Sequence, residues 1–156
     1  MIDLGFNSAY LARYIMGDIV SVSSSFLDKT LNKPVEDSAS CNVIFANGAI
    51  GSIDATFVSP LMSVFELSVY GTKGAYYARF GGSNCAQLRL AGESAAELQL
   101  DELPKAPLSP VAYWVRACVN GESDELYGID GALDMVKFMS AAYRSAKEDS
   151  RRISLA

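Results

Sequence analysis

Apolar positions at the start of the chain recur at helical spacing. In residues 1–17 the apolar side chains lie three or four positions apart, and Gly17 follows the last of them. Glycine commonly ends a helix because it adopts a positive φ at little cost. The pattern predicts a helix over this segment, with these apolar positions: Ile2, Phe6, Ala9, Leu11, Tyr14 and Ile15.

From residue 18 the spacing changes to a period of two. Val20, Val22 and Phe26 alternate with serines, which predicts a strand with one buried face. Residues 28–37 are polar, contain a proline and are predicted to form a loop. Asn47 and Gly48 then separate two β-rich runs, and this pair favours a tight hairpin because both residues tolerate positive φ.

Further strands are predicted in the middle of the chain. Residues 63–80 form a run that turns between Gly71 and Gly74, and weaker runs follow at 86–91 and 97–103. About six strands at such short spacing indicate an antiparallel meander. Neither face of the run 64–70 is strongly charged, so we expect the open side of the sheet to be moderately apolar and to pack against a second copy of the chain.

The last third of the chain returns to helical patterning. Ser109 and Pro110 are suited to begin a helix that ends at Gly121. A broad apolar stripe predicts a second helix over residues 128–147, and the tail 151–156 is a candidate edge strand. The order helix, strands, helices predicts an α+β fold: an open, predominantly antiparallel sheet with helices packed on one face.

Composition narrows the function classes. Residues 1–156 are half hydrophobic and are expected to form one globular domain. The net charge of -5 disfavours a nucleic-acid partner, and no apolar run approaches the roughly 20 residues that span a bilayer. Three widely spaced cysteines indicate reduced thiols in a cytoplasmic protein. The absence of histidine excludes a Ser/His/Asp triad and a His-ligated zinc, and no metal site is expected.

A dinucleotide site requires a glycine-rich turn between a strand and a helix. The glycine pairs here are Gly48 with Gly51, Gly71 with Gly74, and Gly81 with Gly82. The first two lie between predicted strands, the third precedes no predicted helix, and hairpin turns explain them better. We therefore expect no cofactor to bind to this chain.

Four segments, taken in order, resemble the glucose-fructose oxidoreductase, inositol dehydrogenase and MocA family. They are MIDLGFNSAYLARYIMG at 1–17, which is similar to the family's active-site helix, VEDSASCNVIFANGAIGSIDATFVSP at 35–60, LSVYGTKGAYY at 67–77, and the final helix and tail at 127–155. The resemblance implies a C-terminal domain of the dihydrodipicolinate-reductase-like or glyceraldehyde-3-phosphate-dehydrogenase-like type. It also implies an N-terminal Rossmann domain, absent from this chain, with NAD or NADP and a Glu-Lys-Pro lysine.

The family resemblance also suggests site residues. In the family, an Asp and a His four residues later line the site beside the nicotinamide. Asp3 occupies the first position here, and Asn7 replaces the histidine. Asp3 is the candidate catalytic residue, because hydride transfer from a hydroxyl carbon requires a base near that oxygen. Asn7, Tyr10 and Arg13 are candidate substrate-binding residues; Asn7 can orient a hydroxyl but cannot exchange its proton near neutral pH.

Each candidate has a structural alternative. Asp3 is also explained as a helix N-terminal charge, Asn7 as an ordinary polar residue and Tyr10 as a half-buried aromatic residue. Arg13 is also explained by a carboxylate partner, by a contact with the missing domain or as a solvated arginine.

The resemblance implies two classes of function. In the first, the parent protein is an NAD(P)-dependent oxidoreductase of a sugar, cyclitol or related polyol, and this chain, inactive alone, supplies substrate contacts and the oligomer face. In the second, the chain is a non-catalytic dimerisation or small-ligand-binding module derived from that family. A third possibility is a parent that binds cofactor without redox chemistry. The substrate, the choice between NAD and NADP, and the choice between dimer and tetramer stay open.

Overall fold

The computed structural model describes residues 1, 3–28, 30, 34–59, 63–94, 96–97, 108–122 and 128–155. Its contacts divide the chain into two compact units. The first comprises Met1–Val58 and Leu108–Ala156, and the second comprises Ser59–Pro107. That residues 1–156 form one domain stays a prediction. In the described part of the chain, no helix is long and apolar enough to cross a membrane.

The first unit contains a four-stranded antiparallel sheet. Its strands are β1 (Ile19–Leu27), β2 (Ser38–Phe45), β3 (Ile50–Thr56) and β8 (Ile153–Ser154), in the order β3-β2-β1-β8. The tail therefore forms the predicted edge strand: β8 pairs with the start of β1, where Val22 faces Ile153. The β1 serines alternate with apolar residues as the period of two predicted, although a register irregularity separates Ile19 from Ser21.

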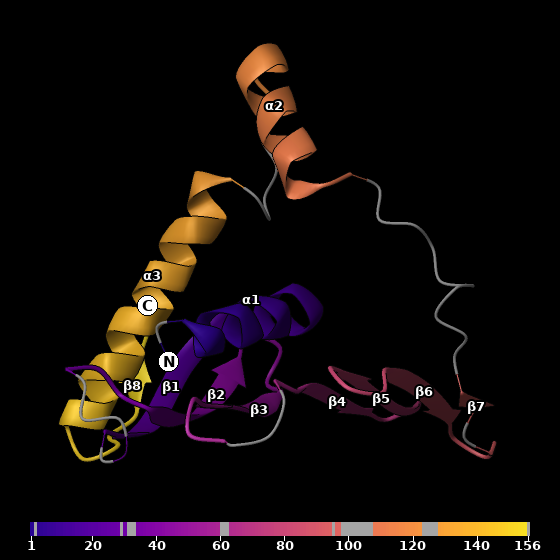
Figure 1. Ribbon diagram of the computed structural model, residues 1–156, viewed down its shortest axis with the longest axis horizontal. Helices are drawn as coiled ribbons and strands as arrows, with labels where there is room; N and C mark the ends of the chain where they lie inside the picture. Colours follow the sequence, from indigo (N-terminus) through magenta and orange to yellow (C-terminus); the bar gives the residue numbers. More distant parts are fainter. Residues whose placement is uncertain are drawn as a thin grey trace. The chain divides into compact units, whose positions relative to one another are not determined.

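Two helices cover one face of this sheet, as predicted. The helix α1 (Leu4–Met16) packs against β3, and α3 (Ile129–Lys147) packs against β1 (Figure 1). The core lies between the helices and the sheet, and its largest fully buried hydrophobic side chains come from α3, β1 and β2: Phe138, Met135, Val22, Val43 and Cys41.

The Asn47-Gly48 hairpin joins β2 to β3 and also contacts α1. Gly48 has a φ of 85°, and its N–H donates to the Phe45 carbonyl at 2.9 Å. The Asn47 side chain accepts from the Ala49 N–H at 2.9 Å and donates to the Met16 carbonyl at 3.0 Å. The turn that the sequence predicted therefore also fixes the C-terminal end of α1.

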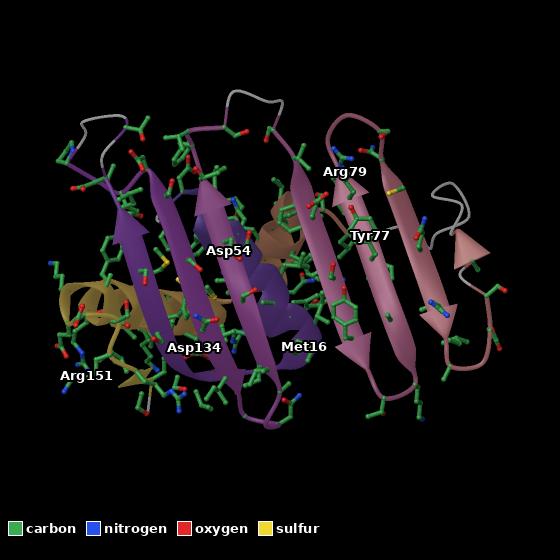
Figure 2. The ribbon with its side chains drawn as sticks, turned by 90° about the horizontal axis from the view of Figure 1, so that it is seen from below. Met16, Asp54, Tyr77, Arg79, Asp134 and Arg151 are labelled. Atoms are coloured by element: carbon green, nitrogen blue, oxygen red, sulfur yellow. The ribbon has the colours of Figure 1, made fainter. Side chains whose placement is uncertain are left out.

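The outer face of this sheet corrects one expectation from the sequence. The face was expected to be moderately apolar, but the register aligns Ser23 with Asn42 and Ser52, and Ser25 with Ser40 and Asp54 (Figure 2). The period of two that buries one side of β1 necessarily places its serine hydroxyls on the other side. The outer face of β1–β3 is therefore largely polar, and Ile50, which is 82% exposed, is an apolar exception.

The second unit is also an antiparallel sheet. It consists of β4 (Phe65–Gly71), β5 (Gly74–Phe80), β6 (Cys85–Leu90) and β7 (Ala96–Glu97), in the order β4-β5-β6-β7. The strands thus form two sheets where one was predicted, while the open antiparallel α+β class is confirmed. Residues 98–103 of the last predicted run lie outside the described residues.

The two faces of this second sheet differ as the alternation predicted. Leu67, Ala78 and Ala86 share one face, on which both alanines are fully buried. The other face carries Glu66 and Arg79, whose charged groups lie 3.7 Å apart, and Tyr77, whose hydroxyl donates to Glu66 at 3.0 Å (Figure 2).

The remaining helix, α2 (Pro110–Asn120), begins and ends as its sequence predicted. The Ser109 hydroxyl accepts the Ala112 N–H at 3.2 Å, Pro110 occupies the first turn, and Gly121 is left-handed with a φ of 67°. These residues are the usual proline-in, glycine-out signals of a helix.

Candidate functional site

The start of α1 presents the two polar residues that the resemblance singled out. Asp3 and Asn7 are exposed, and the Asn7 amide donates a long hydrogen bond, 3.4 Å, to the Asp3 carbonyl. Their spacing of four residues places both side chains on one helical face. Asp3 occupies the N-cap position, but its side chain accepts no capping hydrogen bond. A carboxylate and an amide therefore lie together at an exposed helix end, able to accept from and donate to a ligand hydroxyl.

Tyr10 and Arg13 lie further along α1 and make structural contacts. Tyr10 is half-buried and packs against the core, which agrees with the alternative of a half-buried aromatic residue. Arg13 lies about 15 Å from Asp3 along the helix axis, at 1.5 Å per residue. The structure therefore brings Asp3 and Asn7 together and places Arg13 near the opposite end of the helix.

Arg13 connects α1 to α3. Its Nη2 atom lies 2.9 Å from Asp134 Oδ2 and 3.1 Å from Asp18 Oδ1, and its side chain is 19% exposed. These groups line a cavity of about 250 Å³ together with Lys137, which lies 3.3 Å from Asp134. The ion pairs support the alternative of a carboxylate partner. The substrate-binding role of Arg13 stays a prediction.

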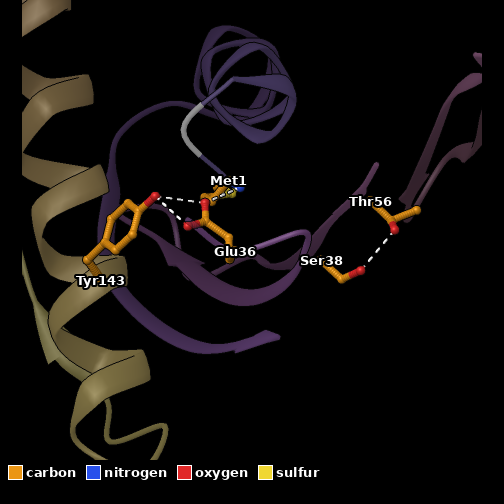
Figure 3. A network of polar contacts seen from close by, with 5 residues as sticks. All are labelled: Met1, Glu36, Ser38, Thr56 and Tyr143. Carbon is orange, nitrogen blue, oxygen red and sulfur yellow. Dashed lines mark hydrogen bonds and ion pairs between the residues drawn. The ribbon is translucent and has the colours of Figure 1, made fainter. Parts of the chain in front are cut away.

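Sequence reasoning missed a polar cluster below the start of α1. Glu36 is buried, and the Tyr143 hydroxyl lies 2.7 Å from each of its carboxylate oxygens (Figure 3). The backbone nitrogen of Met1 also donates to Glu36. Burial, followed by the hydrogen bond and the charge of Glu36, raises the pKa of Tyr143 well above its usual value. The only sequence signal was the acidic pair Glu36-Asp37 immediately before an apolar strand.

Asp37, the second residue of that pair, stabilises the backbone. It is buried, and one of its carboxylate oxygens accepts the Thr30 N–H at 2.6 Å. Its own N–H donates to the Leu27 carbonyl, and its carbonyl accepts the Phe57 N–H. Glu36 and Asp37 therefore have different surroundings although they are adjacent in the sequence.

The cysteines form no disulfide, and no described group of His, Cys, Asp and Glu is arranged to hold a metal ion. Cys41 is buried, Cys85 half-buried and Cys118 exposed. Burial raises the pKa of the Cys41 thiol. A raised pKa keeps the thiol protonated and unreactive, which fits a packing role for Cys41.

The described residues do not fit a dinucleotide. None of the glycines at 48, 51, 71, 74, 81 and 82 lies in a turn that leads from a strand into a helix. The described turns therefore lack the backbone N–H groups at a helix start that hold a pyrophosphate.

Comparisons with known proteins agree on one family. Residues 1–77 match the GFO/IDH/MocA C-terminal domain. No curated protein sequence gives a significant match. Among solved structures, an oxidoreductase from Agrobacterium radiobacter in complex with NAD+, L-tartaric acid and magnesium is similar, with a TM-score of 0.79 and 21% identity over 98% of this chain and 48% of that chain.

Two further structures share the fold. Aldose-aldose oxidoreductase from Caulobacter crescentus, complexed with glycerol, has a TM-score of 0.78 and 23% identity over 97% of this chain and 46% of that one. The WlbA dehydrogenase from Bordetella pertussis, in complex with NADH and UDP-GlcNAcA, has a TM-score of 0.70 and 21% identity over 99% and 44%.

This chain spans about half the length of these solved oxidoreductases. The sequence match covers α1 through most of β5, and the shared fold covers nearly all of the chain. Together they show that this chain belongs to the GFO/IDH/MocA C-terminal domain family.

Proposed function

We propose that the chain is the substrate-binding half of an NAD(P)-dependent oxidoreductase that acts on a sugar, a cyclitol or a related polyol. The observation that carries the proposal is the exposed Asp3 and Asn7 pair at the start of α1. Similar folds occur in proteins named for an aldose substrate or complexed with a nucleotide sugar, which supports the substrate class. The nicotinamide, held by a partner Rossmann domain, would accept or donate the hydride.

Asp3 and Asn7 would have different tasks in this site. A carboxylate at the end of a helix can accept the proton of a substrate hydroxyl as hydride leaves the same carbon. The Asn7 amide can donate to one hydroxyl and accept from another, so it would orient the substrate without exchanging a proton. We expect the chain alone to be inactive.

The test uses the polypeptide that joins this chain to its nucleotide-binding domain, with a panel of polyols and both nicotinamide cofactors. Asp3→Asn should lower kcat by about 100-fold, the lower range for loss of a general base, while the KM for cofactor stays constant. Asp130→Asn is the matched control, because Asp130 is also an exposed carboxylate, in the first turn of α3. Equal turnover by the two variants would refute the catalytic assignment of Asp3.

Asn7 supports a second candidate, a non-catalytic module of the same family that binds a small ligand or dimerises. Asn7 occupies the position where a histidine is expected, and asparagine cannot exchange a proton near neutral pH. Asn7→His in the same polypeptide separates the candidates. A gain in dehydrogenase rate with any polyol supports an oxidoreductase site, whereas no gain with any polyol supports a protein that binds without redox chemistry.

We further propose that the open sheet side forms a homo-oligomer. Within the second sheet, Tyr70 is 81% exposed and shares its face with Tyr77 and the Glu66–Arg79 ion pair. Tyrosine and arginine are enriched at protein interfaces. Sedimentation equilibrium should show a dimer or a higher oligomer that Tyr70→Glu weakens. A monomer at all concentrations would refute this part of the proposal.

A further inference from the structure

A buried carboxylate lies directly below the first turn of α1 (Figure 3). The Glu36 side chain is 4% exposed and contacts the Tyr143 hydroxyl of α3 through both carboxylate oxygens, each at 2.7 Å. The Tyr143 ring packs edge-on against Phe26 of β1, with ring centroids 5.0 Å apart. A buried charge is costly unless it is paired and hydrogen-bonded, so these partners determine where the carboxylate lies.

The group that Glu36 holds is residue 1. The Met1 nitrogen donates to Glu36, and the Met1 carbonyl accepts the Phe6 N–H at 3.0 Å. The Met1 side chain is buried against Gly5, where an added Cβ would lie 2.1 Å from the Met1 sulfur. Three separate contacts therefore fix residue 1, one through each of its nitrogen, its carbonyl and its side chain.

The first turn of α1 has no cap of the usual kind. A helix start normally satisfies its first N–H groups with a Ser, Thr, Asp or Asn side chain. Asp3 accepts no such bond, and the first turn of α1 contains no acidic residue. The position of this turn therefore depends on contacts from outside the helix, and the contacts to residue 1 provide them.

We propose that Glu36 and Tyr143 are positioning residues: they fix residue 1 and, through it, the first turn of α1, so that Asp3 and Asn7 are presented in one orientation. The cluster replaces the cap that Asp3 would otherwise have to provide, and this leaves the Asp3 carboxylate exposed for a ligand. The catalytic meaning of this arrangement rests on the proposed function, whereas the anchoring itself does not.

The experiment compares Glu36→Gln and Tyr143→Phe with Tyr14→Phe. Tyr14 is the matched control, because it loses the same hydroxyl from a side chain on α1 that is 60% exposed. Amide hydrogen exchange of this chain, measured by NMR, should accelerate about tenfold or more for Phe6–Tyr10 in the first two variants, the fold-change expected for a lost charge-assisted hydrogen bond. Amides of β2, such as that of Val43, should keep their wild-type rates.

A second readout separates positioning from general stability. The carboxyl carbon resonance of Asp3 should shift in Glu36→Gln and in Tyr143→Phe and stay constant in Tyr14→Phe. Unchanged exchange at Phe6–Tyr10, equal acceleration in β2, or an unchanged Asp3 resonance would each overturn the proposal.

Turnover by the polypeptide with its nucleotide-binding domain then distinguishes the two proposals. Glu36→Gln and Tyr143→Phe should lower kcat and leave the KM for cofactor unchanged. If Asp3→Asn leaves turnover unchanged while the Asp3 resonance still reports the anchor, the proposed function fails and the positioning role stands.

Discussion

The ion pair between Arg13 and Asp134 offers a quantitative test of whether Arg13 has a structural role. Its two charged atoms lie 2.9 Å apart, and the side chains are 19% and 38% exposed. Exposed pairs contribute up to about 1 kcal/mol and hydrogen bonds to charged groups about 1.5–3 kcal/mol, so this partly buried pair should contribute about 1–2 kcal/mol.

A double-mutant cycle with Arg13→Met and Asp134→Asn measures that contribution. Methionine keeps much of the apolar stem of arginine, and the cycle removes the separate effect of each change, including the Lys137 contact that Asp134 loses. In urea, a coupling of this size corresponds to a midpoint difference of about 0.5–1 M, if the free energy of unfolding changes by about 2 kcal/mol per M. Far-UV circular dichroism follows the unfolding, and a second probe should give the same midpoint if unfolding is two-state.

The matched control is the ion pair between Arg116 and Glu122, whose atoms lie 2.6 Å apart but whose side chains are 51% and 47% exposed. Solvent screening should reduce its coupling to about 0.5 kcal/mol or less. A coupling for Arg13 and Asp134 no larger than that of the control would refute the argument that burial strengthens the pair. It would return Arg13 to the predicted role in substrate binding.

Three further outcomes are expected. Because the pKa of Tyr143 is raised in the folded protein, unfolded tyrosine should lose its proton first as pH rises above about 10, so stability should fall there, and Tyr143→Phe should remove that part of the slope in pH-dependent urea titrations. Alkylation followed by mass spectrometry should modify the exposed Cys118 first and the buried Cys41 only on unfolding, and rapid labelling of Cys41 in the folded protein would contradict the structure. Gly74→Ala should destabilise the second sheet by about 1–3 kcal/mol, because its Cβ would lie 2.3 Å from the Arg89 carbonyl oxygen, whereas Gly71→Ala, with its nearest contact at 3.7 Å, should cost less in thermal unfolding.

Local patterns were sufficient to predict most of the elements. The helix at the start, the Asn47-Gly48 hairpin, the α2 helix between Ser109 and Gly121, and the edge strand of the tail all depend on neighbouring residues. Helical periodicity, turn propensity and capping act over a few positions, so one sequence is enough to reveal them. The position and spacing of Asp3 and Asn7 were likewise visible, because four residues make one helical turn.

The tertiary structure decided what lies far apart in the sequence. Nothing local indicated that Tyr143 contacts Glu36, more than a hundred positions away, or that Arg13 pairs with Asp134. The alternation of β1 predicted two faces, but only the register showed that the serines of β1 align with Asn42, Asp54 and their neighbours to make the outer face polar. Such pairings depend on how helices and strands pack, and the free energy of packing is a property of the whole fold rather than of any short segment.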